Sequence, residues 1–324
     1  MISVIITAHG RKQYLMDAIK SVQSQTLQKQ SFEVIIVKNF RDDVIDRYIE
    51  SSGYSQIVTE SETLGQKISE GILSCHGDVI TFLDDDDLFH ADKLSFLADI
   101  FQRNKQLSYY HNSIITIDEN GRSIHKSTGT NAACDIILNS KDFTARSFRK
   151  ARKFNGDWFM SCISVSRDIA MGSIYLLKTQ KASFDKIMFY QALLSGKDVM
   201  VSKNKLTYYR LHPSMTTVMD EKNSFISKKK DFFLKTMKSL DAIQQSAESN
   251  MRNVVRLVYL HEAINYAVLS GENIGGHQMV QYISLIIRYG TSSDFVWLLL
   301  YSVSLLSRST AQNLYFHRLN SIYS

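Results

Sequence analysis

Four consecutive aspartates, Asp84–Asp87, directly follow a short apolar stretch of the chain. Carboxylates this close together raise one another's pKa values and destabilise the fold unless a cation neutralises them. Mg²⁺ and Mn²⁺ take oxygen ligands and often complete their shells with phosphate oxygens. In an extended backbone, Asp84 and Asp86 point to one side and the other two to the opposite side. We therefore predict that Asp84 and Asp86 bind Mg²⁺ or Mn²⁺, and that the other pair caps a helix beginning near Leu88.

The aspartates lie within alternating strand-like and helical patterns. Apolar, β-branched runs predict strands at residues 2–7, 32–37, 56–58 and 78–83, with helical spacing between them. Short strands that alternate with helices indicate right-handed βαβ units and a largely parallel sheet. Ligands bind beyond the carboxyl ends of such strands. His9, Asn39 and Asp84 each follow a strand, so we expect them to collect along one edge of the sheet.

The pattern changes after about residue 105. Residues 107–117 resemble a strand pair with a turn near 118–121, and residues 199–209 contain another strand. Beyond residue 224 the spacing predicts only helices, at 226–269, 279–288 and 294–308. These patterns predict a domain boundary near residue 220. We expect a domain of residues 1–220 and a helical extension of residues 221–324.

Composition limits the class of protein. The chain has 324 residues, of which 44% are hydrophobic and 22% charged, and this excludes a disordered protein. A formal charge of +6 suits an anionic partner such as a nucleotide diphosphate or a phospholipid surface. The three cysteines are widely spaced, so neither a zinc site nor a disulfide framework is indicated. No signal-peptide pattern or membrane-spanning run is found, and we expect a cytoplasmic protein.

A basic run covers residues 144–153, and Lys228–Lys230 adds a second group of cations. Few aromatic side chains are interleaved with the first run, so no nucleic-acid partner is expected. A solvated loop or a phospholipid-facing patch is the favoured interpretation. Together with the apolar C-terminal helices, these cations suggest peripheral attachment to the inner face of the cell membrane.

Residues 1–100 resemble the nucleotide-sugar-binding half of glycosyltransferase family 2, the inverting enzymes of GT-A fold. The matching pieces are, in order, ISVIITAHGRKQYLMDAIKSVQSQT, FEVIIVKN, LGQKISEGILSCHGDVITFL and DDDDLFHADKL. The order and spacing of these four motifs make the resemblance specific. Residues 180–217 match loosely, and the last hundred residues do not match.

The resemblance implies an α/β protein with the GT-A type nucleotide-diphospho-sugar transferase fold, a mostly parallel central sheet and an all-helical C-terminal extension. Residues 1–100 would bind the donor and residues 101–220 the acceptor. The implied activity is transfer of a sugar, with inversion and a divalent metal, from a nucleotide-sugar donor to an acceptor hydroxyl or a lipid phosphate. A glycan, a lipid-linked molecule or a protein would serve as acceptor.

The same resemblance implies a set of donor-binding residues. They are Thr7, Ala8, His9, Lys38, Asn39, Lys67, Asp84, Asp85, Arg210 and His212. Where the family commonly has an acidic pair for the nucleobase, this chain has Lys38-Asn39, so a uridine donor does not follow. For Lys67 the alternative is a solvated helix lysine. For His212, a metal or phosphate contact competes with an ordinary surface or core histidine.

Sugar transfer also requires a carboxylate that accepts the proton of the attacking hydroxyl. In the family this base is an aspartate far downstream, and Asp185 best fits its short helix. Asp157, beside Trp158, is the rival, and both aspartates also have a helix-cap or turn interpretation. Trp158 would stack on an acceptor sugar or lie in the core.

Parts of the sequence also correspond to three other functions. A dinucleotide-dependent oxidoreductase needs a glycine-rich turn after the first strand, and only Gly10 is there. A metal-dependent nucleotidyltransferase uses paired aspartates but also an early phosphate-gripping loop, which is poorly matched here. A non-catalytic interaction module that retained the fold would use the aspartates for capping alone.

Overall fold

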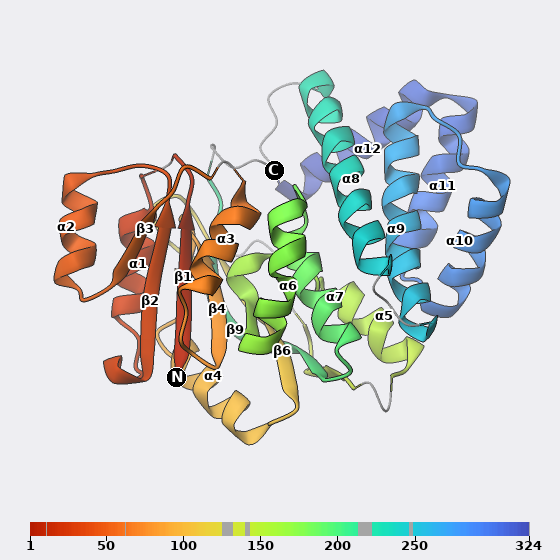
Figure 1. The fold of residues 1–324 in the computed structure, drawn as a ribbon. Helices are drawn as coiled ribbons and strands as arrows, with labels where there is room; N and C mark the ends of the chain where they lie inside the picture. Colours follow the sequence, from red (N-terminus) through yellow and green to blue (C-terminus); the bar gives the residue numbers. More distant parts are fainter. Residues whose placement is uncertain are drawn as a thin grey trace. The chain divides into compact units, whose positions relative to one another are not determined.

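The computed structural model describes residues 1–10, 12–61, 63–124, 132–139, 143–212, 222–245 and 249–323. The chain forms two compact units (Figure 1). The first, which we call the sheet unit, consists of Met1–Phe143 and Phe154–His212. The second, the helical unit, consists of Thr144–Lys153 and Pro213–Ser324. The boundary expected near residue 220 falls outside the described residues and stays a prediction.

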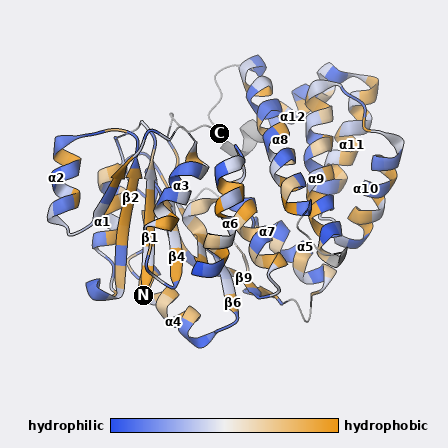
Figure 2. Ribbon diagram, viewed as in Figure 1, coloured by the Kyte–Doolittle hydropathy of each residue, from blue (hydrophilic) through white to orange (hydrophobic). Residues whose placement is uncertain are grey.

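The first half of the sheet unit is a parallel βαβ arrangement in the strand order β3-β2-β1-β4. Its strands are β1 (Ile2–Ala8), β2 (Phe32–Lys38), β3 (Ser55–Val58) and β4 (Val79–Asp84). The helices between them are α1 (Leu15–Gln23), α2 (Asp43–Ser51) and α3 (Leu64–Leu73). All seven residues of β1 are buried, and Figure 2 shows the hydrophobic colouring of β1 and β2. The strands predicted from the apolar runs are confirmed.

The register of these strands brings their carboxyl ends level. Thr7 of β1 lies opposite Asp84 of β4, and Ala8 lies opposite Lys38 of β2. The polar residues that follow each strand therefore emerge at one edge, as predicted.

The second half of the sheet is mixed. β8 (Ile163–Ser166) runs antiparallel between β4 and β6 (Leu107–Ile117), and β9 (Asp198–Arg210) runs parallel to β6. The short strands β5 (Leu88–Phe89) and β7 (Ile136–Leu138) pair antiparallel with β9. The prediction of a strand pair within residues 107–117 was wrong, because β6 is one continuous strand. The turn after it, at Asp118–Gly121, was predicted correctly.

The helix expected to begin near Leu88 was also predicted wrongly. Leu88 and Phe89 belong to β5, and α4 (Lys93–Arg103) begins only after them. The distant strand β9 offers backbone hydrogen-bond partners to this segment, and such tertiary pairing overrides local helical spacing.

A tight helix contact fixes the remaining helices of the sheet unit, α6 (Arg167–Thr179) and α7 (Phe184–Leu194). A Cβ atom on Gly65 of α3 would lie 2.1 Å from the carbonyl oxygen of Leu177 and 2.3 Å from the ring of Phe184. Glycine is therefore required there, and the contact sets where α7 begins.

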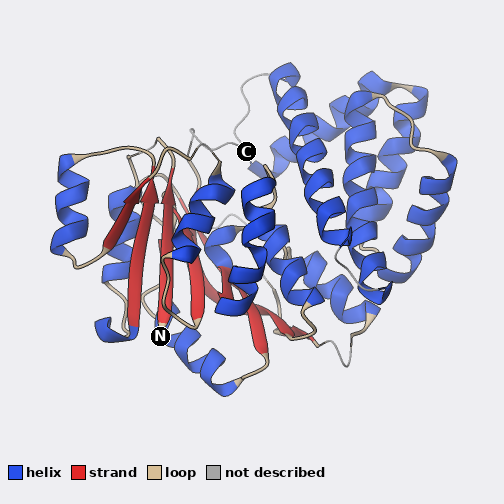
Figure 3. Ribbon diagram, in the orientation of Figure 1, coloured by secondary structure: helices blue, strands red, loops and turns tan. Residues whose placement is uncertain are grey.

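The helical unit contains no strand among its described residues (Figure 3). Its helices are α5 (Ala145–Lys153), α8 (Lys222–Gln245), α9 (Ser249–Ser270), α10 (Gly276–Tyr289), α11 (Ser292–Leu306) and α12 (Arg308–Tyr323). The single helix expected over 226–269 is two helices, and the basic run is the helix α5 rather than a loop. No helix in the described part of the chain is long and apolar enough to cross a membrane.

A buried carboxylate organises the helical unit. Asp294 of α11 is fully buried and binds both terminal nitrogens of Arg152 in α5, at 2.9 and 3.1 Å. It also accepts hydrogen bonds from Thr291 and lies 2.8 Å from Nδ1 of His261 in α9. Burial alone would raise its pKa, but His261 and Arg152 outweigh burial and hold the pKa of Asp294 well below the ordinary value. This one side chain thus links three helices.

Candidate active site

The four aspartates alternate in exposure at the end of β4. Asp84 and Asp86 are partly exposed, whereas Asp85 and Asp87 are buried. The expected extended backbone is not found, because β4 ends at Asp84 and the next residues form a turn in which the N–H of Asp87 donates to the carbonyl oxygen of Asp84 at 3.3 Å. Two carboxylates nevertheless face the edge where the polar residues collect.

The buried pair does not cap a helix, so that part of the prediction was wrong. Asp87 accepts a hydrogen bond from the Ser161 hydroxyl at 2.7 Å and another from the backbone N–H of Arg210 at 3.2 Å. The same Ser161 oxygen accepts the N–H of Asp84 at 3.0 Å. Burial, together with the negative charges of Asp86 and Asp84, raises the pKa of Asp87 well above its ordinary value. An acidic loop with a capping role alone does not describe this arrangement.

The end of β9 meets the aspartates. Arg210 is only 2% exposed, and its Nε donates to the carbonyl oxygen of Asp86 at 2.9 Å. The guanidinium also lies over the ring of Tyr14, 4.4 Å from its centroid. His212 places Nε2 3.2 Å from the Asp86 carboxylate, and its ring packs against the same tyrosine. Arg210 and His212 are thus brought together with Asp86, while their contacts with a donor stay a prediction.

Lys67 is a buried residue of α3. Its ammonium group donates to the carbonyl oxygen of Ser61 at 2.6 Å and lies 2.7 Å from Nδ1 of His9. Burial lowers the pKa of Lys67. The interpretation of a solvated lysine was wrong, because this cation supports an exposed histidine at the end of β1.

Lys38 and Asn39 have different surroundings. Lys38 is fully buried and directs its ammonium group to the carboxylate of Asp46 at 2.7 Å and to the carbonyl of Phe40. The charge of Lys38 is therefore satisfied within its own βα unit. Asn39 accepts the N–H of Gly10 at 2.8 Å and so ties together the loops after β1 and β2.

A second pair of carboxylates lies at the start of α7. Asp185 accepts hydrogen bonds from the backbone N–H groups of Phe159 at 3.0 Å and Lys186 at 2.8 Å. Burial raises its pKa above the ordinary value. Asp157 instead pairs with the Lys186 ammonium at 3.0 Å and accepts from the Tyr190 hydroxyl at 3.3 Å. The two aspartates therefore differ in electrostatic character, although one lysine contacts both.

One short stretch, residues 157–162, contacts both carboxylate groups; we call it the 157–162 segment. Its Phe159 binds Asp185, and two residues later its Ser161 binds Asp87. Phe159 has a backbone φ of 81°. Residues other than glycine rarely adopt this backbone conformation, and such residues are concentrated at functional sites. Sequence analysis missed Phe159 and Ser161, because neither belongs to a recognisable pattern.

Lys93 holds the 157–162 segment in place. The sequence did not point to this residue either. Lys93 is fully buried, and it donates to the carbonyl oxygen of Ser161 at 2.7 Å and to the hydroxyl of Thr207 at 3.1 Å. Burial lowers the pKa of Lys93 to about 7. Such a network specifies one position for Ser161.

Aromatic rings cover the other side of the segment. Phe159 lies edge-on to Tyr209, with ring centroids 4.6 Å apart, and Trp158 contacts both rings. Trp158 is half-buried, so part of its indole remains accessible beside Asp157.

The side chains around the aspartates limit how a metal ion could be bound. Within the described residues, no group of three or more His, Cys, Asp or Glu side chains is arranged to hold a metal ion. The residues predicted as ligands, Asp84 and Asp86, remain a pair of carboxylates at the sheet edge.

The match to a known family agrees with this geometry. Residues 3–170, just over half of the chain, match the family described as "Glycosyl transferase family 2". The chain belongs to glycosyl transferase family 2. The prediction of a glycosyltransferase of this family is confirmed.

Curated relatives include the poly(ribitol-phosphate) beta-N-acetylglucosaminyltransferase TarS of Staphylococcus aureus. It is 22% identical over 217 residues, which cover 64% of this chain and 35% of TarS. An uncharacterized glycosyltransferase of Nostoc, alr2836, is 31% identical over 134 residues, which cover 39% of this chain and 40% of that protein. The chain thus matches only about a third of the length of TarS.

Solved structures show the fold. The crystal structure of S. aureus TarS 1–349 superposes with a TM-score of 0.60 at 15% identity, and covers 98% of this chain and 91% of that one. A second structure of the same protein, in complex with UDP-GlcNAc, gives a TM-score of 0.59 at 13% identity. The predicted GT-A fold with a helical C-terminal region is confirmed.

Proposed function

We propose that this protein transfers a sugar from a nucleoside-diphosphate donor to an acceptor hydroxyl or lipid phosphate, with inversion at the sugar carbon. The observation that carries the proposal is the 157–162 segment, which contacts a carboxylate cluster suited to a donor and a separate carboxylate suited to a base. The complex of TarS with UDP-GlcNAc supports a nucleotide sugar as the donor class.

The carboxylate cluster fits a hard divalent cation. Asp84 and Asp86 offer partly exposed oxygens, and the pKa of Asp87 is raised first by burial and then by the negative charges of Asp86 and Asp84. We assign Asp84 and Asp86 as the residues that would hold Mg²⁺ or Mn²⁺. When bound there, the ion would stabilise the negative charge of the departing diphosphate.

His9 is the clearest donor contact at the edge. Because the Lys67 ammonium donates to Nδ1, the proton of the neutral imidazole resides on Nε2, which is left to donate to the nucleotide. Thr7, Ala8 and Asn39 line the same edge. Lys38 acts indirectly: its ion pair with Asp46 helps to position the loop that follows β2.

Arg210 and His212 orient Asp86, and Asp85 supports the loop from its buried side. The backbone carbonyl of Asp86 is held by Arg210, while its carboxylate faces His212. Both contacts restrict the carboxylate before any donor arrives, and such preorganisation avoids an ordering cost at binding.

Asp185 is the proposed base. Its raised pKa makes it a better proton acceptor than an ordinary aspartate, and it lies on a rigid helix terminus. As the acceptor attacks the sugar carbon, Asp185 takes the hydroxyl proton, and a single displacement inverts that carbon. Asp157 is neutralised by Lys186, so we assign it a positioning role beside Trp158.

The test compares two isosteric variants, Asp185→Asn and Asp157→Asn. Nucleoside-diphosphate release is measured with UDP-GlcNAc and other nucleotide sugars, Mn²⁺, and a panel of glycan and lipid-linked acceptors. Asp185→Asn should reduce transfer by about a hundredfold or more while keeping the donor-induced rise in melting temperature. Asp157→Asn should lose less activity. Wild-type turnover by Asp185→Asn would disprove the assigned base, and the absence of a thermal shift with every donor would disprove the function.

A further inference from the structure

The helical unit carries charge of almost one sign on several of its helices. α5 contains five cations, Arg146, Arg149, Lys150, Arg152 and Lys153, and no anion. From Gly276 to Ser324, Asp294 is the one acidic residue in the sequence. Asp294 is buried and bound to Arg152, so it contributes little negative charge to the surface. The remaining four cations of α5 are exposed.

α5 is fastened to the C-terminal end of α10. The Arg149 side chain donates to the carbonyl oxygen of Ile287 at 3.1 Å and to that of Arg288 at 3.0 Å. A cation at this position also interacts favourably with the helix dipole. Of the exposed cations of α5, Arg149 therefore lies against the last turn of α10, and the others lie on the same short helix.

α10 exposes apolar side chains along one of its faces. Val280, Ile283 and Ile287, which we call the apolar stripe, are 69%, 40% and 68% exposed. Their spacing of three and four residues places them on one face of the helix. In the following helix, Phe295 and Leu299 are 51% and 65% exposed. Aliphatic side chains left in water at helical spacing are a feature of surfaces that bind something.

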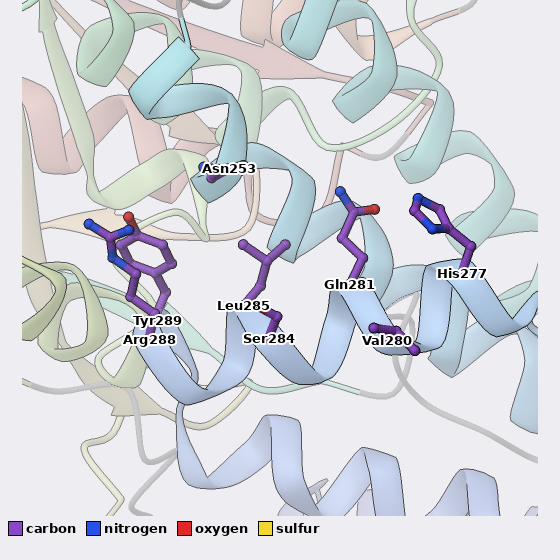
Figure 4. Close-up of a pocket in the computed structure, with 8 residues that line it drawn as sticks. All are labelled: Asn253, His277, Val280, Gln281, Ser284, Leu285, Arg288 and Tyr289. Carbon is purple, nitrogen blue, oxygen red and sulfur yellow. The ribbon is translucent and has the colours of Figure 1, made fainter.

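A shallow groove of about 360 Å³ borders the apolar stripe (Figure 4). It runs along successive turns of α10, where His277, Val280 and Arg288 line it, and Asn253 of α9 contributes from the neighbouring helix. The groove is remote in sequence from the aspartate site, and its side chains carry no catalytic chemistry. It does place a guanidinium group and an imidazole beside exposed aliphatic carbon.

We propose that α5 and the apolar stripe bind the surface of a bilayer rich in anionic phospholipids. The cations match the headgroup phosphates, and the aliphatic side chains match the boundary with the acyl chains. A nucleic acid would use the cations but leave Val280 and Ile287 in water. The helices lie on the bilayer rather than cross it, consistent with their length and composition. This inference does not depend on sugar transfer.

The experiment uses the full chain and sedimentation with vesicles of phosphatidylglycerol or of phosphatidylcholine. The wild type should bind the phosphatidylglycerol vesicles at low salt and be released at high salt, because surface charge attraction is screened. Arg146→Glu with Lys150→Glu removes two exposed cations but keeps Arg149 and Arg152, which attach α5. Each cation near an anionic surface contributes roughly a fivefold gain in partitioning, so this variant should bind at least about twenty-fivefold more weakly.

The apolar part is tested by Val280→Ser with Ile287→Ser, which should weaken binding at every salt concentration. Matched controls lie in the sheet unit: Lys105→Glu with Lys178→Glu for charge, and Val44→Ser with Leu73→Ser for exposed apolar area. Both controls should bind like the wild type, and circular dichroism checks that every variant is folded. Three results would overturn the proposal: no binding to phosphatidylglycerol at low salt, equal losses in test and control variants, or binding to a short DNA duplex that the serine variant leaves unchanged.

Discussion

The two units of this protein each bury an aspartate, and they treat its charge in opposite ways. In the helical unit, Asp294 is bound by Arg152 and His261, and its pKa is held far below the ordinary value. In the sheet unit, Asp87 accepts hydrogen bonds from a serine hydroxyl and a backbone N–H, and its pKa is raised well above the ordinary value. Both side chains are almost completely buried.

The different surroundings of Asp294 and Asp87 indicate different roles for the two buried carboxylates. A buried carboxylate surrounded by cations of its own chain stabilises the fold, and removing it leaves those cations without their partner. A carboxylate whose neighbours are other carboxylates makes the fold less stable than it could be. Such groups cluster at sites that receive a charged ligand. The comparison supports the proposal that the aspartate run binds a charged ligand, whereas Asp294 serves helix packing.

The largest effect is expected from Asp86→Ala, which should lower the rate of sugar transfer by about three orders of magnitude. Asp86 is the carboxylate held by both Arg210 and His212, so its loss removes the most ordered of the proposed metal ligands. The rate of nucleoside-diphosphate release is measured together with the melting temperature. If this variant transfers sugar at the wild-type rate, the proposal that the aspartate run binds the metal and donor is wrong.

Asp294→Asn should destabilise the helical unit by about 3 kcal/mol, because Arg152 and His261 then remain half-buried or buried without a carboxylate. The chain has two tryptophans, and Trp297 lies in the helical unit while Trp158 lies in the sheet unit. In a Trp158→Phe background, urea unfolding followed by Trp297 fluorescence measures this unit alone. An unchanged midpoint would show that the network does not organise the unit.

Asp87→Asn should have the opposite sign and raise the stability of the sheet unit by about 1 kcal/mol. The amide can retain both hydrogen bonds, to Ser161 and to the N–H of Arg210, while it removes a charge repelled by its neighbours. Unfolding is followed by Trp158 fluorescence in a Trp297→Phe background with a chelator present. Destabilisation comparable to that of Asp294→Asn would contradict the distinction between the two carboxylates.

Acid should also weaken the helical unit through Asp294. An unfolded aspartate has a pKa of about 3.9, and the folded pKa of Asp294 is lower. Its contribution to stability is therefore fully present above about pH 4 and is lost as pH falls through and below that value. The urea midpoint of the Trp297 signal should fall between about pH 5 and 3 in the wild type and change less in Asp294→Asn. Parallel curves would assign the acid sensitivity to other groups.

Much of the sheet unit followed from the sequence because its signals are local. Apolar β-branched runs such as those of β1 and β2 leave little choice but a buried strand, and a parallel arrangement then aligns their carboxyl ends. That logic placed His9, Asn39 and Asp84 on one edge. It did not give the turn that begins at Asp84, where the backbone is no longer extended.

The failures share a physical cause, which is pairing with distant residues. Leu88 has helical spacing, yet β9, more than a hundred residues away, holds it in β5. Ser161 contacts Asp87 only because β8 and the preceding turn fold against β4. The pairing that distinguishes Asp157 from Asp185 is also non-local, because the Lys186 ammonium group lies 3.0 Å from the carboxylate of Asp157. Each of these contacts joins residues that are far apart in the sequence.

The 157–162 segment behaves as a spacer of fixed length. With the N–H of Phe159 bonded to Asp185 and the hydroxyl of Ser161 bonded to Asp87, its backbone limits the distance between the proposed base and the aspartate run. An insertion of a single residue there would disturb both ends together, whereas a change later in α7 would leave the donor side in place. To vary the acceptor of such a protein, one would change residues of α7 after Lys186 and keep Asp185 and residues 157–162 unchanged.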